Sequence, residues 1–157
     1  MLAVTLSEAG TKGFMQKLLT EDVFDGFDTR SVMVSSFARM EIDGAAEREG
    51  DEEGQAQPRK QVYSTWKALR PYVTQFVRGG GRPKGMKLVF SLAAEEMASR
   101  FPEASALFLN VLFDGKVVLT TGASQRSFSL DKALEYAWED HVRSFLTANQ
   151  IQFEMED

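Results

Sequence analysis

A glycine-rich run in the middle of the chain carries three cations, since residues 78–85 have the sequence RGGGRPKG. Glycine amides together with Arg78, Arg82 and Lys84 could hold a phosphate or a sulfate. The run follows a predicted helix and leads into a predicted strand, so the negative end of the helix dipole would face the anion. The sequence therefore favours a structural turn, with Gly79 as a helix cap, over an anion site.

The segment around this run has an unusual charge balance. Residues 55–94 contain no Asp or Glu but eight Lys and Arg, which leaves a net charge of −13 on the rest of the chain. This segment could bind nucleic acid or another polyanion through Arg78, Arg82, Lys84 and Lys87. It could equally neutralise the acidic remainder within the fold or across an oligomer. Trp66 and Tyr72 are the nearby aromatics, but both lie on the apolar side of a predicted helix, which favours burial over base stacking.

Several catalytic chemistries are excluded by residue type. The chain has no Cys and a single His, so thiol nucleophiles and Cys-ligated metals are impossible, and His141 alone would supply any imidazole. His141 lies at the edge of the apolar stripe of the last predicted helix, where a partly buried structural role is favoured. We expect no cofactor and no metal. An enzyme that acts on an anionic substrate through Arg78, Arg82, Lys84 and His141 remains the alternative.

Length and composition predict one folded domain. The chain has 157 residues, 43% of them hydrophobic and 26% charged, with no secretion signal and no apolar run long enough to cross a membrane. We therefore expect a cytoplasmic protein without membrane contact. Residues 43–58 are rich in acids and glycine, which predicts a flexible loop: either a solvated hairpin tip or an acidic arm for a partner.

Hydrophobic periodicity predicts an α+β fold with a mostly antiparallel sheet of six to eight strands and three helices. The strongest local signal is the hairpin at Asp114 and Gly115. Pro71 either kinks a long helix or begins a shorter one near Arg70. Strands are expected at 2–6, within 29–43 as one bent strand or two, at 62–63, 86–92, 107–113, 116–121 and 126–129. Helices are expected at 11–20, 66–77 and 131–147, with a helical turn at 93–101 and a terminal strand or docked tail at 151–153.

Several strings resemble a family of short uncharacterised proteins from anaerobic Gram-positive bacteria: FMQKLL (14–19), TWKALRP (65–71), LFLN (107–110), TTG (120–122) and FSLDKALEYAW (128–138). The resemblance spans most of the chain and brings no activity, cofactor or site residue. The order strand, helix, strands also resembles the repeated unit of DNA sliding clamps, with 1–43 as one half and 61–121 as the other. That similarity implies an oligomeric or DNA-associated role.

Taken together, these patterns predict a binding or assembly module without catalytic chemistry, which acts through a sheet or helix face. A protein partner or self-association is expected. A clamp-like protein that associates with nucleic acid or another polyanion is the alternative.

Overall fold

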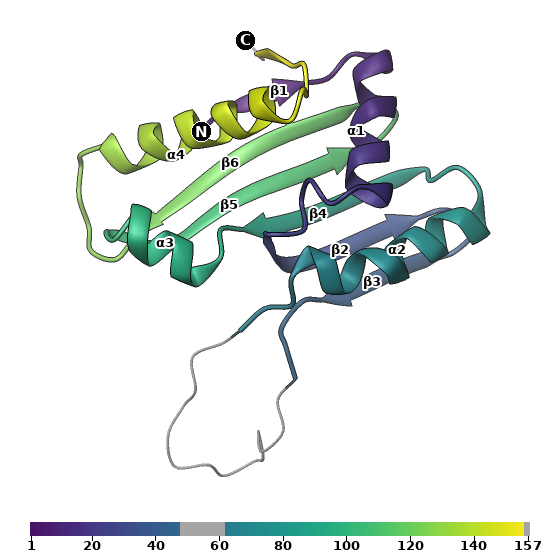
Figure 1. Cartoon of the computed structure of the whole chain (residues 1–157), viewed down its shortest axis with the longest axis horizontal. Coiled ribbons are helices and arrows are strands. Elements are labelled where there is room, and N and C mark those ends of the chain that lie inside the picture. The colour runs from purple at the N-terminus through teal and green to yellow at the C-terminus, as the bar shows by residue number, and fades with distance from the viewer. Residues whose placement is uncertain (48–61, 156–157) are drawn as a thin grey trace.

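Figure 1 shows the computed structural model of the chain, which describes residues 1–47 and 62–155. Within these residues the helices are α1 (Glu8–Thr20), α2 (Trp66–Gly80), α3 (Ala94–Arg100) and α4 (Ala133–Ala148). The strands are β1 (Ala3–Thr5), β2 (Asp28–Ser35), β3 (Arg39–Asp43), β4 (Gly85–Ser91), β5 (Ala104–Phe113), β6 (Val117–Gln125) and β7 (Glu154–Met155). The α+β class is confirmed.

One antiparallel sheet contains all seven strands, in the order β3-β2-β4-β5-β6-β1-β7. The strand count agrees with the six to eight expected. Strands β2 and β3 resolve the region 29–43 into a hairpin rather than one bent strand. Strand β1 pairs with β6 and β7, so residues from both ends of the described chain lie together at one side of the sheet.

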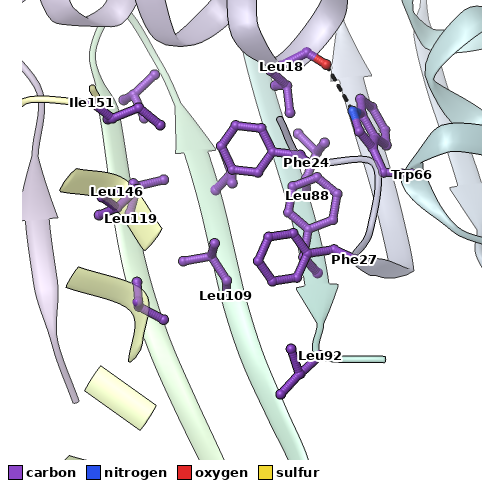
Figure 2. Close-up of a cluster of buried hydrophobic side chains, with 14 of the residues drawn as sticks. Leu18, Phe24, Phe27, Trp66, Leu88, Leu92, Leu109, Leu119, Leu146 and Ile151 are labelled. Atoms are coloured by element: carbon purple, nitrogen blue, oxygen red, sulfur yellow. Dashed lines mark hydrogen bonds between the residues drawn. The ribbon is translucent and has the colours of Figure 1, made fainter. Parts of the chain in front are cut away.

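The core fills the space between the sheet and the helices that cover one of its faces. In Figure 1, α1, α2 and α4 lie in front of the strands. The strands alternate accordingly, and Met86, Leu88 and Phe90 of β4 are all buried beneath them. Figure 2 shows Phe24 and Phe27 in this layer, and their rings stack on Phe90 with centroids 5.7 and 5.6 Å away. A fully buried large apolar side chain contributes about 1.5–3 kcal/mol relative to an exposed one.

Helix α2 is continuous through Pro71, so the helix does not begin near Arg70. Its cap is Thr65, whose hydroxyl accepts from the amide of Ala68 at 3.3 Å. The buried indole of Trp66 anchors the first turn, because its Nε1 donates to the Leu18 carbonyl of α1 at 2.9 Å (Figure 2). Proline removes one bond to the carbonyl four residues earlier, that of the exposed Lys67, where water can replace it.

Three local expectations are wrong. The segment 93–101 forms a true helix, α3, so the described chain has four helices rather than three. Residues 126–129 are not a strand, because β6 ends at Gln125 and a loop leads to α4. Tyr72 is 68% exposed on α2, although its position on the apolar side predicted burial.

The β5–β6 hairpin is confirmed. Its turn lies between the paired residues Phe113 and Val117, and Gly115 has the positive φ of 105° that this turn requires. At residues 62–63 the expected short strand is reduced to one isolated bridge, between Ala45 and Tyr63.

The two halves expected to repeat do not match one another. The first half contains β1, α1, β2 and β3, and β1 lies four places away from β2 in the sheet. The second half begins with α2, contains the additional helix α3, and places β4, β5 and β6 side by side. The order of elements along the sequence suggested a repeat. That order does not show which strands pair, and the pairing differs between the two halves.

Most of the predicted acidic loop, from residue 48 onward, lies outside the residues that the structure describes. Of residues 1–47 and 62–155, none belongs to a helix that is long and apolar enough to span a membrane.

Candidate functional site

The four cations proposed from the sequence lie around one end of the sheet. Arg78 is in the last turn of α2, and Arg82 and Lys84 are in the connection to β4, where the Lys84 amide donates to the Ser35 carbonyl at 2.7 Å. Lys87 is two residues into β4 from Gly85. All four side chains are exposed, and none forms an ion pair with the part of the chain that the structure describes.

The glycines of this run have structural explanations. The cap of α2 is Gly81, with φ of 77°, a conformation that L side chains rarely adopt; the expected cap, Gly79, lies inside the helix, which continues to Gly80. A Cβ on Gly80 would lie 2.6 Å from the ring of Phe37, so the loop between β2 and β3 packs directly on this backbone. Both features support the structural-turn interpretation that the sequence favoured.

His141 does not join these cations. Its ring stacks on Trp138 with centroids 5.3 Å apart and meets the edge of Phe101 at 5.7 Å, between α4 and the end of α3. Burial lowers the pKa of His141, with opposing effects from Glu96 and Arg100. Arg78 lies instead in the last turn of α2, and Arg82 and Lys84 follow that helix, at the end of the sheet marked by Ser35 and Gly85. The grouping required by the enzyme alternative is therefore not formed.

The face of the sheet opposite α1, α2 and α4, hereafter the uncovered face, carries the side chains that alternate with the core. No described helix covers it. Pairing across β2, β4, β5 and β6 places several apolar side chains there, each half-buried or exposed. These are Met33, Val89, Phe108, Leu112 and Val118.

Arg30 reaches this face through an irregularity in β2. Thr29 pairs with Phe90 and Ser31 pairs with Val89, so Arg30 is an extra residue with no partner in β4. Bulges of this kind redirect a side chain and recur next to functional sites. The Gly44 amide donates to the Arg30 carbonyl at 2.9 Å, which fixes the backbone of the bulge against the end of β3.

The Arg30 guanidinium is held on three sides. Its carbon lies 4.0 Å from the centroid of the Tyr63 ring and 5.2 Å from that of Phe108, so both aromatic rings make cation–π contacts. Its Nε donates to the buried Ser91 hydroxyl at 3.1 Å. Asp28 is the acid that interacts with it electrostatically, and burial raises the pKa of Asp28 while the positive charge of Arg30 opposes that rise.

Arg30 also lines a shallow groove of about 620 Å³ between β3, β2 and β4. Of the four cations proposed from the sequence, Lys87 alone lines this groove. The opposite wall carries Glu41 and Asp43 of the edge strand β3, and Met33 and Val89 supply apolar surface. The groove therefore joins two cations, two carboxylates and an apolar floor.

Sequence reasoning missed Arg30 as a site residue. It is visible in the sequence as an interruption of the alternating apolar residues between 29 and 43. That signal did not identify a bulge, because Tyr63, Ser91 and Phe108 come from distant parts of the chain.

The arrangement suits binding of anionic or amphipathic groups. Within residues 1–47 and 62–155, no three His, Asp or Glu side chains gather in a way that could hold a metal ion. A guanidinium between two rings can instead present its terminal N–H groups to a carboxylate or phosphate.

These features define an α+β protein with a seven-stranded antiparallel sheet that the described helices cover on one face. The chain belongs to a family of unknown function (DUF5721), whose model matches residues 17–154. No curated protein and no solved structure matches it.

Proposed function

We propose that the protein is a non-catalytic binding module that docks a partner protein on the uncovered face of its sheet. The observation that carries this proposal is a set of apolar side chains on this face, contributed by β2, β4, β5 and β6 and interspersed with Lys87, Asn110 and Thr120. An antiparallel sheet with one solvated face normally alternates apolar and polar residues, so its outer side is polar. Apolar surface gathered on one face and rimmed by polar residues is instead typical of protein interaction sites.

The charges on this face specify the partner's chemistry. Arg30 and Lys87 lie within the apolar surface, whereas Glu41 and Asp43 lie on the edge strand β3. A fitting partner presents apolar side chains over the centre of the face together with a carboxylate near the two cations. We propose that this encounter takes place in the cytoplasm.

A photo-crosslinking experiment in the cells that make the protein tests this proposal. A benzophenone side chain in place of Leu112, which is 37% exposed on the uncovered face, should give one discrete adduct with a different protein. The same side chain in place of Tyr72, exposed on α2, is the matched control and should not give that adduct. Val118→Asp, which places an unpaired charge on the same face, should remove the Leu112 adduct.

Three results would overturn the proposal. One is the absence of an adduct from Leu112, and another is the same adduct from both positions. The third is an adduct of twice the mass of this chain, because that product would identify the occupant as a second copy.

The exposed cations at the end of α2 favour a second candidate, binding of nucleic acid or another polyanion. Arg78, Arg82 and Lys84 have no ionic partner among the residues that the structure describes, while the nearby Arg70 is paired with Asp25. Such binding would weaken steeply with added salt, by about 10³-fold or more between 50 and 200 mM for six to ten phosphate contacts and less for fewer. Charge reversal at Arg82 and Lys84 should abolish it, and salt-insensitive binding would contradict it.

A further inference from the structure

The strongest feature of the uncovered face is a guanidinium whose position is fixed before any ligand binds. The guanidinium of Arg30 packs against the rings of Tyr63 and Phe108. Its Nε donates to the hydroxyl of Ser91, so the side chain is held in one position. An arginine on an open surface normally loses much rotamer freedom when it binds. Here that loss has already occurred in folding, so binding at Arg30 costs less entropy.

The terminal nitrogens of Arg30 are not used by the fold. Neither Nη atom donates a hydrogen bond to any residue within 1–47 and 62–155, and no carboxylate there lies within ion-pair distance. By contrast, Arg70 uses Nε and Nη2 together, and binds both oxygens of Asp25 at 2.9 Å. Arg70 shows the contact that a guanidinium makes when a carboxylate is available, and no carboxylate of the described residues makes that contact with Arg30.

We infer that Arg30 is a receptor for one carboxylate of the docked protein, bound by the terminal N–H groups in the groove between β3, β2 and β4. This inference rests on the proposed function. A planar carboxylate matches the fork of a guanidinium, and Lys87 adds a second positive charge in the same groove.

The groove walls favour a carboxylate over a phosphate chain. Glu41, which is paired with Arg39 at 2.9 Å, and Asp43 line the same groove, so repulsion increases with each negative charge that a ligand carries. A single acidic side chain meets less of that repulsion, and its apolar neighbours can cover Met33 and Val89. The site therefore selects an acidic residue within an apolar protein segment.

The first test titrates the full chain with sodium acetate, a minimal carboxylate, and follows the backbone amide signals of Ser31 and Ser91 by NMR. Sodium chloride at the same ionic strength is the control salt. We expect saturable shifts with acetate and none with chloride. In Arg30→Met the acetate shifts should vanish, whereas Arg78→Met, a cation outside the groove, should keep them.

Arg30→Lys retains the positive charge but lacks the planar guanidinium. It keeps the inference testable if Arg30→Met fails to fold. It should bind acetate about threefold or more weakly than the unmodified chain, because one ammonium cannot make the paired contact. Three results overturn the inference: acetate shifts that persist in Arg30→Met, equal acetate affinity in Arg30→Lys, or inorganic phosphate that binds about tenfold more tightly than acetate.

The second test repeats the Leu112 cross-link in these variants and separates the two proposals. The yield of the adduct should fall about tenfold or more in Arg30→Met, because the carboxylate of the partner then loses its positive counterpart. The yield should remain unchanged in Arg78→Met. An undiminished adduct in Arg30→Met refutes the carboxylate inference and leaves the docking face supported. No adduct in the unmodified chain refutes the proposed function, and the carboxylate inference, which requires a docked protein, fails with it.

Discussion

Gly44→Ala should destabilise the fold and disrupt the Arg30 site together. Gly44 follows β3 and lies against β2, where a Cβ atom would be 1.6 Å from the carbonyl oxygen of Thr29 and 2.7 Å from its carbon. Both are backbone atoms, so no side-chain rotation relieves the clash. The backbone at residue 44 and the backbone of Thr29 must therefore separate by well over an ångström for alanine to fit.

The cost follows from the hydrogen bonds on either side of this contact. The Gly44 amide donates to Arg30 at 2.9 Å, and its carbonyl accepts from the Ser64 amide at 2.8 Å. Loss of both bonds costs about 1–3 kcal/mol in net terms. Movement of Ser64 displaces the neighbouring Tyr63 from Arg30, and a cation–π contact adds about 0.5–2 kcal/mol. We expect the free energy of unfolding to fall by about 2–5 kcal/mol.

Urea unfolding followed by circular dichroism measures this loss, with the acetate titration as the readout for the Arg30 site. Gly13→Ala is the matched control, because nothing lies within 4 Å of its Cβ inside α1. It should stabilise the protein by about 0.5–1 kcal/mol through helix propensity. An unfolding midpoint in Gly44→Ala equal to that of the unmodified chain would refute the close approach of residue 44 to β2.

Three further predictions concern the helices. Trp138→Ala should cost about 3–5 kcal/mol by urea unfolding, because the ring is buried and its Nε1 donates to Phe108 at 2.9 Å; a loss below about 1 kcal/mol would contradict the packing of α4. Arg70→Lys should lower the melting temperature, because loss of the paired contact with Asp25 reduces the free energy of unfolding by about 1 kcal/mol. An unchanged melting temperature would show that the pair contributes nothing. Burial lowers the pKa of His141, so the unfolded chain binds a proton more readily, and this residue reduces stability as pH falls below about 6.5. His141→Gln should flatten the stability profile between about pH 7 and 5, and an identical slope in both proteins would refute this role.

Local sequence signals predicted the elements whose conformation depends on neighbouring residues. Asp114 and Gly115 identified the β5–β6 hairpin, because the turn needs a residue with positive φ. The apolar stripe of α4, with Trp138 and Leu146 buried, follows from helical spacing alone. Pro71 left a longer and a shorter helix open, and the structure has the longer one, whose first turn is held by the contact of the Trp66 indole with α1.

The candidate site was less accessible to prediction. Lys87 was predicted as a binding residue because it lies in a stretch without acids, and it lines the groove together with Arg30. Arg78, Arg82 and Lys84 belong to the same stretch but lie at the end of α2. They are separated from Lys87 because the chain changes from helix α2 to strand β4 between residues 80 and 85.

The sequence by itself determined the α+β class, the β5–β6 hairpin and the exclusion of thiol chemistry, because these depend on residue type and on spacing over a few positions. The tertiary structure decided that β1 pairs with β6 rather than β2, and that α1, α2 and α4 lie on the same face of the sheet. It also decided that a bulge in β2 places Arg30 between Tyr63 and Phe108. Strand order and bulges arise from contacts between distant segments of the chain. A local pattern of apolar and polar residues does not specify which segments make those contacts.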